Sequence, residues 1–100
     1  MAKSRAADAN LNKILQQAYT QYERQNYQAA AVFFQEIIVS EKADIPTYFY
    51  AGISQLNKES ADLDLALQHF NSVILQGNNA YVGTAKWLSA LTYLKQNNRV

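Results

Sequence analysis

A chain of 100 residues is long enough for one small domain, and its 49% content of apolar residues excludes intrinsic disorder, because disordered chains are poor in such residues. Nine basic and eight acidic residues give a net charge of +1, which argues against binding to nucleic acid or to an anionic membrane surface. No cysteine is present, so disulfides, thiolate metal sites and cysteine nucleophiles are excluded.

A membrane span and a signal peptide are not expected. The longest unbroken apolar run, residues 29–34, covers six residues, whereas a spanning helix needs about twenty. The first ten residues include basic side chains but no apolar stretch behind them. The compartment stays open between the cytoplasm and a periplasm.

The first predicted helix covers residues 10–24, where apolar residues recur at alternating steps of three and one. This spacing places them on one side of an α-helix. The stripe recurs 34 residues later and, in part, a further 38 residues later, which predicts helices at 45–58 and 82–97. The three stripes are Leu11, Ile14, Leu15, Ala18, Tyr19 and Tyr22; Ile45, Tyr48, Phe49, Gly52, Ile53 and Leu56; and Trp87, Ala90, Leu91 and Leu94.

A second pattern predicts the intervening helices, at residues 27–41 and 62–76. Asn26, Asp44 and Asp62 precede helices as N-caps, because their side-chain oxygens can accept hydrogen bonds from the free amides of a first turn. We call the first, third and fifth helices type A and the other two type B; repeats of this length are typical of stacked helical hairpins. The type B residues that recur at an offset of 36 are Ala30, Phe34, Ile37 and Ile38, and then Ala66, Phe70, Val73 and Ile74.

Residues 18–38 resemble a tetratricopeptide repeat (TPR). That family places a small residue in its first helix, a polar turn followed by an aromatic residue, then a small residue and an aromatic residue one turn later. Gln25 departs from the family, which usually has glycine there, so this turn must close in another way. The matching positions are Ala18, Asn26, Tyr27, Ala30 and Phe34 in the first copy and Gly52, Asp62, Leu63, Ala66 and Phe70 in the second, with residues 88–98 as the start of a third.

The resemblance implies an all-α domain over residues 10–98. Antiparallel helical hairpins would stack as a right-handed α-solenoid of about five helices, or about two and a half repeats. Residues 1–9 are expected to be a disordered or frayed N-terminus.

The C-terminal end of the repeat pattern is open to two interpretations. Asn98 is in register with the caps Asn26 and Asp62, so a third type B helix is expected there, and the chain is expected to be a fragment of a longer array. The alternative is that the fifth helix is a native closing helix, with a polar outer face. Without a sixth helix, Leu88 and Tyr93 are expected to stay partly exposed.

No constellation of residues points to catalysis, a metal or a cofactor. His69 is the sole histidine, so a zinc site is not expected, and we expect its side chain to face solvent or lie at an edge. Asp62 and Asp64 are two residues apart and therefore point to different sides of a helix. The prediction is a protein that is not an enzyme and needs no cofactor.

In TPR proteins the first helices of the repeats line a concave groove and supply the ligand-binding residues. The resemblance therefore implies a protein- or peptide-binding surface made of type A residues. The lysine–asparagine clamp of chaperone-binding TPR proteins is lacking, because Leu15, Tyr19 and Phe49 stand where it needs other residues. The predicted binding residues are Leu15, Tyr19, Tyr22, Phe49, Ile53, Leu56, Trp87, Leu91 and Leu94.

Such an apolar groove suits an apolar peptide or helix, or burial by further helices of the same protein. The function expected by this analogy is a non-catalytic protein–protein interaction scaffold with a protein or peptide partner. The alternative is a structural or assembly module, a homo-oligomer that self-associates through its groove or through its C-terminal end.

Overall fold

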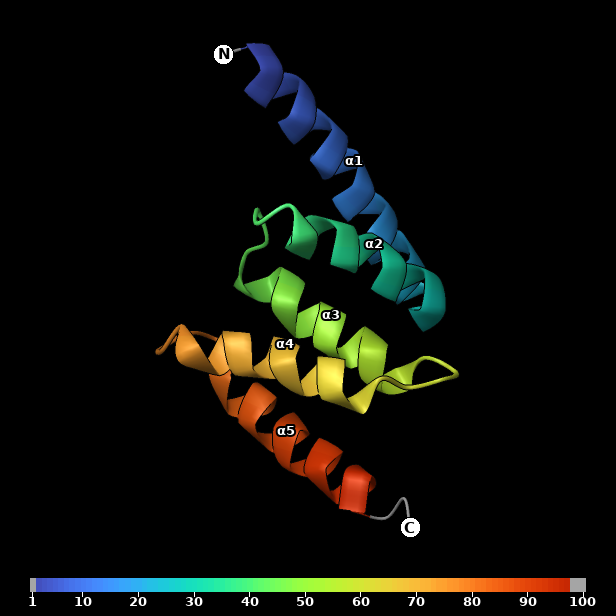
Figure 1. Cartoon of the computed structure of the whole chain (residues 1–100), viewed down its shortest axis with the longest axis vertical. Helices are drawn as coiled ribbons and strands as arrows, with labels where there is room; N and C mark the ends of the chain where they lie inside the picture. The colour runs from blue at the N-terminus through green and yellow to red at the C-terminus, as the bar shows by residue number, and fades with distance from the viewer. Residues whose placement is uncertain (1, 98–100) are drawn as a thin grey trace.

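The structure, a computed structural model, describes the backbone of residues 2–97 and the side chains of residues 9–97. The described part of the chain contains five helices and no strand, which confirms the predicted all-α class (Figure 1). Residues 2–9, expected to be disordered or frayed, belong to the first helix, in keeping with their alanine content. The helices are α1 (Ala2–Glu23), α2 (Tyr27–Val39), α3 (Ile45–Asn57), α4 (Leu63–Leu75) and α5 (Val82–Asn97).

The helices follow one another through the molecule in chain order. Each packs chiefly against its neighbours in sequence, α1 on α2, α2 on α3, α3 on α4 and α4 on α5. The result is an elongated body of 51 × 30 × 20 Å, with the N-terminal part of α1 at one end and α5 at the other (Figure 1). Two apolar clusters, one for each helical hairpin, form its core.

The first hairpin is held by Phe34 of α2, which packs against Ala18 of α1. Both side chains are fully buried, as is Ala30 beside them. The ring of Tyr19 meets Phe34 edge-on, with 5.1 Å between ring centroids. The small side chain at position 18 therefore provides the space that the aromatic ring fills.

The second hairpin repeats this packing with Gly52 and Phe70. Phe70 is fully buried, and a Cβ atom added at Gly52 would lie 2.6 Å from Cε1 of its ring. Ala66, the equivalent of Ala30, is also fully buried. Glycine is thus required here by the close approach of the ring.

The turns and caps follow the chemistry of the sequence. The side chains of Asn26, Asp44 and Asp62 accept hydrogen bonds from backbone amides in the first turns of α2, α3 and α4, which confirms all three caps. Gln25, in place of the expected glycine, adopts a positive φ of 62°. The amide of Asn26 then reaches the carbonyl of Gln21 at 2.9 Å, which closes α1.

The two residues of α5 that were expected to stay partly exposed differ in their surroundings. Leu88 is half-buried and packs against the core of the second hairpin, beside the fully buried Ala85 and Thr92. Tyr93 is 57% exposed, as expected. Leu88 is 38 residues after Tyr50, which lies on the side of α3 that packs against the first hairpin. The equivalent side of α5 faces the preceding helix, α4, and Leu88 therefore contacts it.

A substitution at Gly52 tests the close approach. In Gly52→Ala, the new methyl group would overlap the ring of Phe70, so the free energy of unfolding is expected to fall by about 1–3 kcal/mol. Gly83→Ala is the matched control, since nothing lies within 4 Å of that position in α5, and alanine there should be neutral or stabilising by up to about 1 kcal/mol. Equal effects in urea unfolding would contradict the packing described.

Candidate functional site

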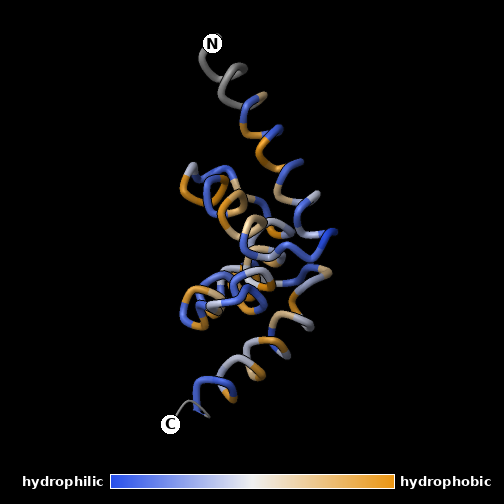
Figure 2. Tube along the Cα trace, turned by 90° about the vertical axis from the view of Figure 1, so that its right-hand side faces the viewer, coloured by the Kyte–Doolittle hydropathy of each residue, from blue (hydrophilic) through white to orange (hydrophobic). Residues whose placement is uncertain are grey.

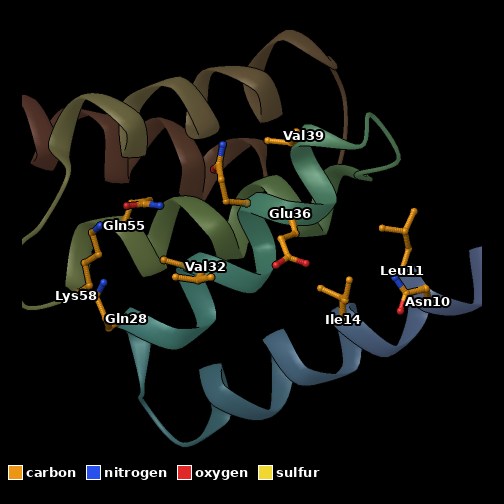
Figure 3. Close-up of a pocket in the computed structure, with 11 residues that line it drawn as sticks. Asn10, Leu11, Ile14, Gln28, Val32, Glu36, Val39, Gln55 and Lys58 are labelled. Carbon is orange, nitrogen blue, oxygen red and sulfur yellow. The ribbon is translucent and has the colours of Figure 1, made fainter. Parts of the chain in front are cut away.

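A cavity of about 600 Å³ crosses the outer side of α2, between the N-terminal half of α1 and the C-terminal end of α3 (Figure 3). Its apolar wall comes from α1 and α2, and its polar side chains come from all three helices. The lining residues are Asn10, Leu11, Ile14, Gln28, Ala31, Val32, Gln35, Glu36, Val39, Gln55 and Lys58.

The cavity exists because α2 carries apolar residues on two sides. One side, which includes Phe34, faces the two neighbouring helices. On the outer side, Val32 is 54% exposed and Val39 is 71% exposed. Ile14 of α1, which is half-buried, projects into the space beside the C-terminal half of α2 (Figure 3). The site therefore offers apolar side chains that are still in contact with water.

Gln55 supplies an unusual polar group to this cavity. Its side chain is 4% exposed, and Oε1 is the one buried side-chain oxygen or nitrogen among the described residues that has no hydrogen-bond partner. Leaving a buried polar atom unpaired costs about 1–3 kcal/mol. Lys58 and Gln28 lie close by at the same end (Figure 3). A ligand that brought a hydrogen-bond donor to this end would relieve that cost.

His69 lies behind the cavity wall, and its burial corrects the expectation of a solvent-facing or edge position. The imidazole is 3% exposed, and its Nε2 lies 3.2 Å from Oε1 of Gln35, a lining residue. Burial lowers the pKa of His69 to about 4, against the opposing charge of Asp62. The ring is therefore neutral at pH 7, donates from Nε2 and orients the Gln35 amide. A lone histidine has no periodic signal, so the sequence did not indicate this contact.

The predicted groove residues do not come together in one cavity. Leu15 and Tyr19 line a second cavity of about 600 Å³ together with polar residues of α1 only. Phe49 and Leu56 are buried inside the second hairpin. The other predicted residues lie in three places: Tyr22 in an aromatic cluster, Ile53 half-buried in the second hairpin, and Trp87, Leu91 and Leu94 on α5.

The aromatic cluster shows what these type A residues do instead. The rings of Tyr19 and Tyr22 both meet Tyr50 edge-on, with centroids 5.6 and 4.9 Å apart, and both contact Phe34. Burial raises the pKa of Tyr19 to about 12, and the carboxylate of Asp44 adds to the shift. These side chains join α1, α2 and α3, so their first role is packing.

Val32, Val39 and Gln55 are the site residues that sequence reasoning missed. The signal available was the two valines, which lie seven residues apart on α2 and outside the repeated stripe. In α4 the corresponding positions hold Gln68 and the exposed Leu75, so the apolar residue at the position of Val32 is the part that the second hairpin lacks.

Within the part of the chain that the structure describes, no group of three or more metal-binding side chains comes together. None of the described helices has both the length and the apolar character needed to cross a bilayer. The chain matches no protein-family model, and no curated protein or solved structure is detectably similar to it. Function must therefore be argued from the cavity, the packing and the charges themselves.

The burial of His69 makes stability depend on pH. In the unfolded chain His69 has a pKa near 6.5 and binds a proton below that pH, whereas in the folded chain its pKa is about 4. The free energy of unfolding is therefore highest above about pH 6.5. It falls by up to about 3 kcal/mol as the pH drops from 6.5 towards 4. Urea unfolding at pH 7, 6 and 5 measures this loss. His69→Gln keeps a donor for Gln35 but cannot titrate, so an equal pH slope in that variant would contradict the assignment.

Proposed function

We propose that the chain is a non-catalytic protein–protein interaction scaffold, built as a TPR-like right-handed solenoid of helical hairpins, that binds an apolar helix or peptide of another protein. The support for the TPR-like architecture is internal. A phenylalanine packs against a small residue in both hairpins, and consecutive helices pack in chain order. The capped turns recur at the same offset as the packing residues.

The observation that carries the interaction function is the cavity across α2. Its middle is apolar, with Val32, Val39 and Ile14 available to a ligand's hydrocarbon side chains. Sites that bind ligands are concave and largely apolar, with a few polar groups that fix orientation. Here the polar groups are the unpaired side-chain oxygen of Gln55 and the charge of Lys58. We place the ligand there rather than along the predicted groove, whose residues Phe49 and Leu56 are buried.

A pair of substitutions tests this site. Peptides selected from a displayed library against the wild-type chain are expected to bind Val32→Glu at least tenfold more weakly, because a carboxylate would be forced into an apolar contact. Gln68→Glu is the matched control: it adds the same charge at the equivalent exposed position of α4. Fluorescence anisotropy of the labelled peptides gives both affinities.

Equal affinity for the wild type and Val32→Glu would remove the cavity as the binding site. Equal melting temperatures of the two variants would show that the loss of binding is local, as expected for a side chain that is 54% exposed.

A second candidate function is assembly, in which the chain self-associates. One observation favours it: Trp87, Tyr93 and Leu94 of α5 are 64%, 57% and 60% exposed. Exposed apolar patches of this kind mark interaction surfaces. Sedimentation over a range of concentrations distinguishes the two functions, since a scaffold for a separate partner remains a monomer and an assembly module does not.

A further inference from the structure

The outer side of α5 carries an apolar stripe, which we call the open face of α5: Trp87, Ala90, Leu91 and Leu94. Hydrophobic residues recur along α5 at one end of the molecule, and no other described helix lies beyond them (Figure 2). Trp87 and Leu94 are 64% and 60% exposed.

The repeat register identifies the equivalent surface on α3. Subtracting 38 from the numbers of Trp87 and Leu94 gives Phe49 and Leu56, which are 7% and 8% exposed because α4 covers them. Ala90 corresponds to Gly52, where the ring of Phe70 lies. The open face of α5 is therefore equivalent to the face of α3 that packs against the type B helix α4. On α5, no described type B helix covers it.

The outer side of α1, at the other end of the stack, is different. The residues on this side of α1 lie 34 positions before the α3 residues that pack towards α2. Unlike those α3 residues, they are exposed to solvent, and all four are polar. They are Lys13, Gln16, Gln17 and Thr20. A polar end of this kind terminates a helical stack. It also offers no apolar surface to the open face of α5, so two copies of the chain do not fit head to tail.

Two copies of α5 also fit each other poorly. In an antiparallel pair centred between Ala90 and Leu91, Lys86 of one copy lies near Lys95 of the other, and α5 has no acidic residue to compensate. A second copy is therefore the weaker occupant.

We propose that the open face of α5 binds an amphipathic helix of a partner protein, antiparallel to α5, with an aromatic side chain seated against Ala90. The model for this contact is Phe34 on Ala18, an alanine that is fully buried beneath the ring. Acidic residues near the N-terminus of the partner helix complement Lys95, which lies in the last turn of α5. This surface is separate from the cavity across α2, and the inference does not depend on that cavity.

The probe is a synthetic peptide with the sequence of residues 61–76, which has the type B pattern, two aspartates at its start and no tryptophan. Trp87 is the only tryptophan in the chain, so its emission reports on this face directly. We expect a saturable blue shift of the emission as the peptide is added. The same peptide with alanine in place of its phenylalanine should bind at least tenfold more weakly.

Two variants of the chain locate the contact. Leu94→Lys changes an exposed position, so the variant is expected to keep the wild-type melting temperature. Its affinity for the peptide, measured by the blue shift of Trp87, is expected to be at least tenfold lower. Val32→Lys alters the cavity across α2 and is expected to bind the peptide as the wild type does. Loss of binding in Val32→Lys but not in Leu94→Lys would overturn this inference while leaving the cavity proposal standing.

Two further outcomes would also overturn it. One is the absence of any blue shift with the peptide at millimolar concentration. The other is a blue shift of Trp87 that depends on the concentration of the chain alone, with dimers in sedimentation that Leu94→Lys abolishes, since this would show that a second copy occupies the face.

Discussion

The fold depends on the contact of a phenylalanine ring with a small residue inside each hairpin. Phe70 occupies space that a side chain at Gly52 would need, and Phe34 is buried in the same cluster as the small residue Ala18. This contact sets the closeness of the paired helices, and aromatic packing across the hairpins follows from it: Tyr50 touches the rings of both the first cluster and Phe49. A helix pair held this closely has little freedom to slide, because either ring would meet backbone.

The sequence predicted the helices well because the information required is local. Cap chemistry at Asn26 and Asp62 and the three-and-four spacing of apolar residues need no knowledge of neighbours. The spacing does not say which neighbour covers which stripe. In α5, Trp87 belongs to the repeated stripe and Leu88 lies outside it, and only the arrangement in space shows that Leu88 meets α4 while Trp87 stays exposed. His69 was misplaced for the same reason, since its partner Gln35 is 34 residues away.

The candidate site shows a limit of reasoning from repeats. Comparing copies finds what the copies share, and what they share here is packing: Tyr19 and Phe49 hold hairpins together. The cavity across α2 depends on Val32, which has no apolar counterpart in α4, and on Gln55, whose buried side-chain oxygen Oε1 has no hydrogen-bond partner. Differences between copies are where a repeated fold can acquire a site of its own, and they are invisible to the pattern that identifies the fold.

The chain-order packing has a consequence for cooperativity. Because each helix is supported chiefly by its neighbours in sequence, α1 and α5 each have one supporting helix where α3 has two. In such a chain, stability is the sum of terms between neighbours, and opening begins at the least supported end. Amide exchange should then be faster in α1 and α5 than in α3. A ligand bound to α5 would slow amide exchange in α4 as well. Binding at one end would thus stabilise the neighbouring helix without any change of shape.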